Sequence, residues 1–368
     1  MEFICKKSNL QKSLAIAENI ISSKNNLSLL SNVLLEVENN KLTISASDLK
    51  VSFKTSFDVD MKSSGKITVF NNKLYNIVKE IPEEDIHIIL NDEKILNIKP
   101  FQSVTIDFNL KGISPDKFPT IQSISDDKYF IISQKILSEM IKKTLFSVSN
   151  DETRYYLNGV FMEKSENLLK FVSTDGKRLS YIKKFSEIPE LESLSIIIPP
   201  KILSEAIKVL TEEGEAEIAF SKNHIFMRIN HYYFVSNLID GEFPDYEAAI
   251  PSEYENQFVF NNKEVQSAIR RISLLTDMET HKMIFDLFEN TLRIYSTETN
   301  IGKAFEIVDI EYSGAEVSIA FNYTYMLDVL REIQNESITI SFNNETSAIM
   351  LFAADDKDYI HIIMPMQR

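Results

Sequence analysis

The stretch Val69-Phe70-Asn71-Asn72-Lys73 returns 190 positions later as Val259-Phe260-Asn261-Asn262-Lys263, and this repetition decides the fold. Both copies resemble the end of a strand followed by the start of a helix, because an Asn side chain can accept a free N–H of the first helical turn. Comparable junctions lie at Ser8, Asn71, Ser133, Pro199, Asn261 and Asn322. Their spacings of 63, 62, 66, 62 and 61 residues are regular enough to indicate an internal repeat.

Each junction is followed by apolar residues at helical spacing and then by about three runs rich in β-branched and aromatic residues. In the first and last copies these runs are 33–37, 42–46, 51–57, 337–342, 348–352 and 359–363. A Phe-Pro pair also recurs, at 118–119 and 243–244. The pattern predicts an α+β fold in which six β-α-β-β-β units form three tandem domains, at 1–126, 127–252 and 253–368.

The composition is that of a folded soluble chain, with 44% apolar and 25% charged residues among 368. No run of 18 apolar residues predicts a membrane span, and the first ten residues lack the apolar core of a signal peptide. The single cysteine, Cys5, excludes an internal disulfide framework and favours a reducing cytoplasm. Its apolar neighbours indicate that it packs in a core rather than reacts.

The charge of the chain is unevenly distributed. The net charge is −15, yet the predicted helices together carry +5, which leaves −20 for the rest of the chain; these helices are 8–23, 72–81, 134–147, 200–210, 262–274 and 323–333. If they share one side, that side would attract a phosphate backbone without recognising sequence. For any single lysine, a solvated helix face is the simpler explanation; the sum favours a basic surface.

Motifs of enzymatic chemistry are not found. The sequence has no P-loop, no GxGxxG and no GxSxG, and its five histidines lack the spacing of metal ligands. Asp175-Gly176 is better explained by a turn between strands than by catalysis. The sequence therefore predicts no catalytic residue, no metal site and no cofactor. An acid–base hydrolase built on clustered carboxylates stays open as an alternative class.

Five short motifs occur in an order that resembles a known family. They are Arg154-Tyr155-Tyr156-Leu157-Asn158-Gly159, Ser173-Thr174-Asp175-Gly176-Lys177-Arg178-Leu179, Asp240-Gly241-Glu242-Phe243-Pro244-Asp245-Tyr246, Tyr312-Ser313-Gly314-Ala315-Glu316 and Met364-Pro365-Met366. Together they are similar to the beta subunit of bacterial DNA polymerase III, the sliding clamp family, and the resemblance covers the whole chain.

The resemblance implies a non-enzymatic, head-to-tail homodimeric ring of six similar domains around double-stranded DNA. Helices would line the hole and antiparallel sheets would form the outside. The implied partners are the DNA polymerase III alpha subunit, the clamp loader, and other proteins with a clamp-binding motif, such as repair polymerases, ligase and mismatch-repair proteins. No membrane partner is implied, and the location would be cytoplasmic.

The resemblance also implies site residues. A partner-peptide cleft would use Leu157, Thr174, Gly176, Lys177, Arg178, Leu179, Pro244, Asn322, Tyr325, Ile362, Met364, Pro365 and Met366. DNA contacts match Lys24, Arg154, Tyr155 and Tyr156, and the helix charges add Lys142, Lys143, Arg270 and Arg271. Dimer contacts match Phe108 on one chain and Leu274 and Leu275 on the other. The simpler alternatives are core filling by Met364 and Met366 and strand packing by one of the paired tyrosines.

Three departures from the family's pattern concern the edge of this cleft. Glu247-Ala248-Ala249 stand where many members have basic residues, Lys177 stands where histidine is common, and the chain ends in Gln367-Arg368 instead of Arg-Leu. An adaptable groove of Leu, Pro and Met would remain in any of these cases. A repeat-built peptide-binding scaffold without a DNA role is therefore the second hypothesis.

Overall fold

The computed structural model describes residues 1–21, 29–82, 84–102, 105–185 and 193–367. The chain divides into two compact units. Unit 1 consists of Met1–Lys135 and Lys201–Leu238, and unit 2 of Ile136–Pro200 and Ile239–Arg368. Among the described residues, no helix is long and apolar enough to cross a membrane.

The order of elements repeats β-α-β-β-β six times, as the junction spacing predicts. Unit 1 contains β1 (Glu2–Lys6), α1 (Lys7–Ile20), β2 (Asn32–Glu38), β3 (Lys41–Ser47), β4 (Val51–Asp58), β5 (Asp60–Ser63), β6 (Gly65–Phe70), α2 (Asn71–Glu80), β7 (Asp85–Leu90), β8 (Ile95–Pro100), β9 (Phe108–Ile113), β10 (Phe130–Ser133), α4 (Pro200–Ile207), β15 (Glu215–Phe220), β16 (His224–Ile229) and β17 (Tyr232–Asn237). The additional strand β5 pairs with β1 and was not predicted.

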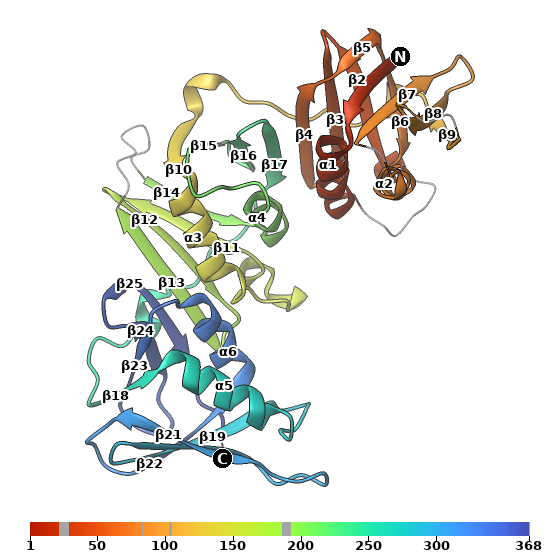
Figure 1. Ribbon diagram of the computed structural model, residues 1–368. Coiled ribbons are helices and arrows are strands. Elements are labelled where there is room, and N and C mark those ends of the chain that lie inside the picture. The colour runs from red at the N-terminus through yellow and green to blue at the C-terminus, as the bar shows by residue number, and fades with distance from the viewer. Residues whose placement is uncertain (22–28, 83, 103–104, 186–192, 368) are drawn as a thin grey trace. The chain divides into compact units, whose positions relative to one another are not determined.

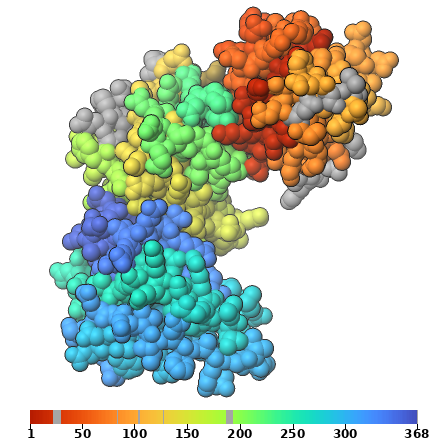
Figure 2. All heavy atoms as spheres, viewed as in Figure 1, coloured from red at the N-terminus to blue at the C-terminus, as the bar shows by residue number. Residues whose placement is uncertain are grey.

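Unit 2 holds the remaining copies. Its elements are α3 (Gln134–Leu145, whose first two residues belong to unit 1), β11 (Val160–Ser165), β12 (Leu168–Thr174), β13 (Arg178–Phe185), β14 (Ser193–Ile198), β18 (Asn256–Asn261), α5 (Asn262–Ser273), β19 (Lys282–Phe288), β20 (Thr291–Ser296), β21 (Phe305–Glu311), β22 (Val317–Asn322), α6 (Tyr323–Glu332), β23 (Ser337–Phe342), β24 (Ile349–Ala353) and β25 (Asp356–Ile363). Helices α5 and α6 lie side by side in Figure 1, and the residues around them form a close-packed surface in Figure 2.

Antiparallel ladders join copies of the repeat that are far apart in sequence. In unit 1, β17 pairs with β4 from Tyr232↔Thr55 to Ser236↔Val51, within a sheet of 13 strands. In unit 2, β13 pairs with β25 from Arg178↔Ile363 onward, within a sheet of 12 strands. The two compact units thus cut across the predicted domain boundaries at 126/127 and 252/253, which stay a prediction.

The six predicted helices are confirmed, but all of them end earlier than predicted. Ile21, Ile81 and Ile333 continue the apolar pattern of α1, α2 and α6, yet their backbones are extended. All three side chains are nevertheless buried. Apolar spacing therefore overestimates these helices because the first residue after each one still packs into the core.

The first copy of the repeated pentapeptide does not use its first asparagine as a cap. Asn71 is already the first residue of α2, and the capping position belongs to Phe70, which makes no side-chain cap. The Asn71 amide is fully buried and donates to the Leu14 carbonyl at 3.2 Å and to the Glu18 carboxylate at 2.6 Å. The predicted cap at Asn71 is therefore wrong, because the side chain joins α2 to α1 instead.

The second copy is displaced by one residue along its helix. Asn261 is the cap of α5, and its side-chain oxygen accepts the Glu264 N–H at 3.2 Å, as predicted. Asn262 is the buried residue, and its amide donates to the carbonyls of Ile333 at 2.7 Å and Asn335 at 3.2 Å. The buried asparagine between paired helices is thus the first of the pair in one copy and the second in the other.

Candidate functional site

Three residues of the predicted cleft belong to one apolar cluster in unit 2. Leu157, Leu179 and Ile362 are buried there together with Phe243, and Leu179 faces Ile362 across the β13–β25 ladder. Chain segments separated by up to about two hundred positions thus meet in one place. Pro244, which follows Phe243, is exposed at the border of the cluster.

The C-terminal segment runs from this cluster past the turn between β12 and β13. The Met364 N–H donates to the Lys177 carbonyl at 2.9 Å, and the Met366 N–H donates to the Ala320 carbonyl at 2.8 Å. Met364 is 47% exposed, whereas Pro365 and Met366 are half-buried. Met364 therefore does not fill a core, and it offers a flexible apolar side chain at the surface.

The turn at 174–178 is held by its own side chains. The Asp175 carboxylate accepts the N–H groups of Lys177 and Arg178 at 2.9 and 3.0 Å. The Thr174 hydroxyl accepts the Gly176 N–H at 3.0 Å, and Gly176 has a φ of +86°, which favours glycine. Asp175 is thus a turn residue, as the sequence indicates, and Lys177 stands exposed at the tip.

Arg178 connects this turn to two helices. Its guanidinium binds the carboxylates of Asp175 at 3.1 Å and Asp328 at 2.7 Å, and the Phe146 carbonyl at 2.6 Å. It also lies 4.5 Å from the centre of the Tyr325 ring. Its side chain is only 10% exposed. Arg178 therefore holds the cleft turn against α6 and has little free surface of its own.

The start of α6 supplies the remaining predicted cleft residues. Asn322 caps this helix, with its side-chain oxygen accepting the Thr324 N–H at 2.9 Å. Tyr325 is half-buried one residue later. The structure thus gathers the predicted cleft residues at the junction of β13, β25 and α6, and Asp328 is a contributor that the sequence did not single out.

The acidic edge that departs from the family's pattern is internally paired. Lys170 lies 3.1 Å from the Glu247 carboxylate and 3.5 Å from that of Glu163, and the Tyr246 hydroxyl donates to Glu163 at 2.5 Å. Burial, and then the Glu163 hydrogen bond, raise the pKa of Tyr246 far above its usual range. Tyr246 therefore stays protonated and anchors this edge.

The predicted DNA loop is bound to the cleft turn. The Asp151 carboxylate accepts the Thr153 N–H at 2.9 Å and binds the Arg154 guanidinium at 3.0 Å. The Thr153 hydroxyl and N–H, followed by Arg154, lower the pKa of Asp151 to about 2. Arg154 also donates to the Asp175 carbonyl at 3.1 Å.

The two tyrosines of this loop differ in exposure. Tyr155 is 55% exposed, whereas Tyr156 is half-buried against the apolar cluster that contains Leu157. Their rings meet edge to face with centres 5.8 Å apart. Tyr155 is thus accessible to a ligand. Tyr156 packs mainly against protein, but it lies in the 3₁₀ helix Glu152–Leu157 and not in a strand, so the strand-packing alternative is wrong. Lys24 lies outside the described residues.

The basic pair of α3 is divided between surface and interior. Lys142 is exposed and forms no ion pair with any described residue. Lys143 is 14% exposed and contacts the carboxylates of Glu139 at 2.8 Å and Asp356 at 3.0 Å. Its ammonium also lies 4.6 Å from the centre of the Tyr359 ring. Of the two, Lys142 is therefore the exposed cation, without a described carboxylate at ion-pairing distance, although its charge acts on Glu332.

The basic pair of α5 is divided between a free and a paired cation, and both are exposed. The Arg270 guanidinium is exposed, and among the described residues it donates only to the neutral Gln266 side chain, at 2.8 Å. Arg271 binds both oxygens of Glu306, at 2.5 and 2.9 Å. Arg271 remains 60% exposed, so its pair is at the surface. Arg270 is therefore the freer cation of the two.

Comparison with known proteins matches the whole chain to one family. Family models of the N-terminal, central and C-terminal domains of the DNA polymerase III beta subunit match residues 1–122, 131–245 and 247–367. A beta sliding clamp from Treponema pallidum is 34% identical over 371 residues, and one from Pseudomonas aeruginosa 31% over 369, each covering all of both chains.

The chain belongs to the DNA polymerase III beta subunit family. Sliding clamps of this family are non-catalytic processivity factors of DNA replication that bind DNA and polymerase. Both the recognised family and the fold class of three clamp domains, with helices and antiparallel sheets, are therefore confirmed.

Solved sliding clamps share this fold. A Pseudomonas aeruginosa clamp bound to griselimycin has a TM-score of 0.92 at 31% identity and covers all of both chains. A Bacillus subtilis clamp has a TM-score of 0.92 at 26% identity and covers 100% of this chain and 99% of its own. The similarity extends along the complete sliding clamp and is not limited to one domain.

Apolar side chains stand exposed near the predicted dimer contacts of this sliding clamp. In unit 2, Leu274 is 79% exposed and Leu275 half-buried; nearby Ile301 and Phe305 are also exposed. A β-carbon at Gly302 would lie 3.7 Å from Leu275, which places the 299–302 turn beside it. In unit 1, Phe108 is half-buried at the start of β9.

A buried hydrogen-bond network in this sliding clamp contains serine and histidine, as a catalytic triad does, but solvent cannot reach it. Ser147 bonds to Ser180 at 2.7 Å, and Ser180 bonds to His361 Nδ1 at 2.7 Å. His361 is fully buried, and burial, followed by the Arg178 charge, lowers its pKa well below the usual value. The imidazole is therefore neutral and structural. Within the described ranges, no group of three His, Cys, Asp or Glu residues could hold a metal.

Proposed function

We propose that two copies of this chain form a head-to-tail ring around double-stranded DNA and hold polymerase there through a peptide cleft. One observation supports the proposal: in a chain that belongs to the sliding clamp family along its full length, Leu157, Leu179 and Ile362 share one apolar cluster, and exposed Met364 follows close behind Ile362. The domains at 1–126, 127–252 and 253–368 are part of this proposal.

The proposed cleft suits a short peptide with one or two apolar anchors. Its floor is Leu157, Leu179 and Ile362, and its adaptable border is Met364, with Pro244 opposite the C-terminal segment. One such site would be shared in turn by the polymerase III alpha subunit, the clamp loader, repair polymerases, ligase and mismatch-repair proteins in the cytoplasm. Competition among these partners then follows from the single site.

The proposed DNA surface uses the uncompensated cations of the helices. Lys142 and Arg270 would each face phosphate without recognising sequence, with Lys143 and Arg271 behind them. Arg154 and Tyr155, together with Lys24, would add contacts from loops. Helices would line the hole and the acidic sheets the outside, so DNA would be favoured only within the ring.

The proposed dimer joins Phe108 of one subunit to Leu274 and Leu275 of the other. Apolar residues that lie fully or partly at the surface in two separate places on one chain suit a closed heterologous contact. Because Leu274 is 79% exposed in the isolated chain, its burial on dimerisation would also stabilise the assembly.

Release from DNA of defined topology tests the ring. The protein is loaded by a clamp loader onto nicked circular DNA, and the DNA is then cut once. A topologically linked ring is expected to stay on the circle and to leave the linear product within minutes. Retention that is equal on circular and linear DNA would contradict encirclement.

The cleft has its own test. Met364→Ala combined with Leu179→Ala is expected to weaken binding of a polymerase-derived clamp-binding peptide at least tenfold, because two apolar contacts are lost. The control, Met278→Ala, removes a methionine that is 76% exposed elsewhere. Dimer mass is expected to stay constant in all variants. Unchanged peptide affinity in the double variant would show that the site is misplaced.

A further inference from the structure

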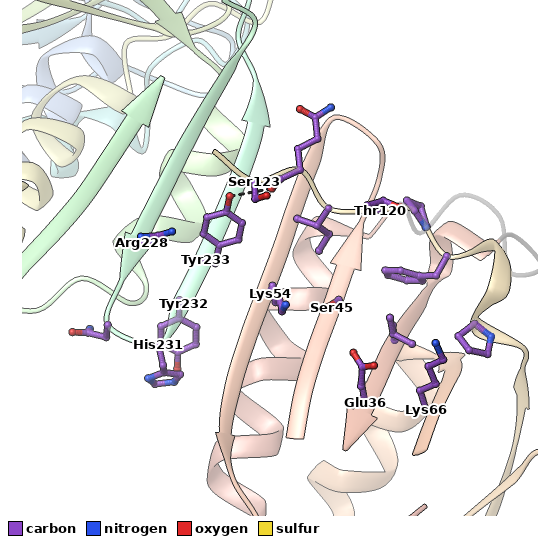
Figure 3. Close-up of a pocket in the computed structure, with 17 residues that line it drawn as sticks. Glu36, Ser45, Lys54, Lys66, Thr120, Ser123, Arg228, His231, Tyr232 and Tyr233 are labelled. Atoms are coloured by element: carbon purple, nitrogen blue, oxygen red, sulfur yellow. Dashed lines mark hydrogen bonds between the residues drawn. The ribbon is translucent and has the colours of Figure 1, made fainter. Parts of the chain in front are cut away.

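A cavity of about 680 Å³ lies in unit 1, apart from every surface assigned above. Its floor is the face of β2, β3, β4 and β6 that points away from the buried side chains Val33, Leu35 and Val37. The segment 115–123 crosses over this face, and β16 and β17 close one side. Figure 3 shows Lys54, Ser45 and the neighbouring floor side chains beneath this crossing segment.

Arg228, at one end of the cavity, is already neutralised. Its guanidinium binds the carboxylates of Asp126 at 2.7 Å and Glu217 at 3.2 Å, and lies 4.0 Å from the centre of the Tyr129 ring. Arg228 therefore forms part of the cavity wall, and its charge is not available to a ligand.

Two lysines of the floor are uncompensated. Lys54 and Lys66 are exposed, and neither forms an ion pair or hydrogen bond with a residue that the structure describes. Lys54 faces Tyr233 across the ladder, and Lys66 faces Glu36, the one carboxylate of the floor. Three strand spacings and an offset of two residues along the strand separate the lysines, about 16 Å between backbones. Their long side chains can reach a common ligand from both sides.

The crossing segment adds free donors and an apolar surface. In the described part of the chain, the backbone N–H groups of residues 120–124 donate no hydrogen bond. The Gln122 carbonyl accepts the Tyr233 hydroxyl at 3.0 Å. Phe118 lines the cavity from this segment, and Leu34 lines it from the floor. The cavity thus combines two cations, amides without an acceptor among the described residues, and a ring.

We propose that this cavity binds a nucleoside polyphosphate. The phosphate chain would lie between the ammonium groups of Lys54 and Lys66, since lysine serves as a point charge for phosphate. The base would pack against Phe118, and free amides of the crossing segment would bind its polar edge or the sugar. A volume of about 680 Å³ suits one such molecule and is too small for a folded partner.

Titration calorimetry of the full-length dimer with ATP, without magnesium, tests the proposal. Binding is expected, and it is expected to weaken at least tenfold in the double variant Lys54→Gln, Lys66→Gln. The control, Lys41→Gln with Lys222→Gln, removes two exposed lysines of unit 1 that do not line the cavity, and should bind as the unmodified protein does. Thermal unfolding midpoints of the apo variants verify folding.

Four results would overturn the proposal. The first is no heat of binding at millimolar ATP, and the second is equal affinity in the cavity and control variants. The third is that tripolyphosphate binds as tightly as ATP, because the packing of the base against Phe118 would then contribute nothing to affinity. A 5′-phosphorylated pentathymidylate should bind more weakly than ATP, because the cavity holds one nucleotide. The reverse order would identify a nucleic-acid end as the source and reject the free nucleotide.

Discussion

Helices α3 and α5 carry the same charges at the same places but differ in what surrounds them. Each has 12 residues, with adjacent basic residues at the ninth and tenth positions. In both, the first of the two, Lys142 or Arg270, has no carboxylate partner among the described residues, and the second is paired. Lys143 itself is only 14% exposed, whereas Arg271 is 60% exposed, although the carboxylates that they bind are similarly accessible, at 25% to 31%. The repeat therefore specifies where a basic residue stands on the helix, and carboxylates on distant strands determine whether that residue is free to bind a ligand.

The largest effect is expected from reversing the two free cations. Lys142→Glu with Arg270→Glu should weaken binding of a short duplex about a hundredfold at low salt, because two phosphate contacts become repulsive. The slope of log affinity against log salt should fall by about two. The control, Lys41→Glu with Lys222→Glu, changes the net charge equally. Equal losses in both variants would mean that DNA senses only net charge.

Removing the paired lysine should affect stability instead. Lys143→Ala is expected to lower the free energy of unfolding by about 2 kcal/mol, because Asp356 loses its cation in a mostly buried site, while Glu139 keeps Lys184 at 3.0 Å. Arg271→Ala should leave the denaturant midpoint unchanged, because its pair is solvated. Urea unfolding of both variants tests this prediction. Equal shifts of the two unfolding midpoints would contradict the difference between the two environments.

A smaller gain is expected from releasing Arg271. Glu306→Gln removes its carboxylate partner and should raise duplex affinity two- to threefold by freeing one cation for phosphate. Glu311→Gln is the matched control, since Glu311 is exposed on the same strand and the charge change is identical. Fluorescence anisotropy at fixed salt compares them, and an equal gain in the control would assign the effect to net charge.

The smallest effect is a dependence on pH. Burial alone would raise the pKa of Glu139, but Lys143 and Lys184 outweigh it and hold the pKa below 4.5. A depressed pKa in the folded state gives stability that is present above the unfolded value and lost as pH falls through the folded value. The midpoint difference between the unmodified protein and Glu139→Gln should therefore shrink below about pH 4.5. A constant difference from pH 6 to 3 would contradict this.

Local signals in the sequence were sufficient for the framework. The junctions at Pro199, Asn261 and Asn322 mark the starts of α4, α5 and α6, because proline or an asparagine cap acts within one helical turn. The run 337–342 is β23. Buried Cys5, whose pKa burial and then Asp85 raise to about 12, also follows from its apolar neighbours.

Long-range pairing could not be obtained in that way. Counting charges treats Lys142 and Lys143 alike, yet Asp356, which compensates Lys143, is 213 positions away. The contact of Arg178 with Asp328 spans 150 positions, and that of Ser180 with His361 spans 181. Such partners come into contact only once the sheets have formed. A local sequence pattern therefore cannot predict these contacts.

The offset between the two copies of the repeated pentapeptide has a geometric consequence. One residue along an α-helix corresponds to a rotation of about 100° about its axis. Asn71 and Asn262 therefore point in equivalent directions, although Asn71 and Asn261 are the matching letters. If the two repeats were superimposed by aligning their identical residues, helix α5 would be rotated about its axis by more than a quarter of a revolution relative to α2. Only an alignment on the buried amide brings like surfaces of the two helices together.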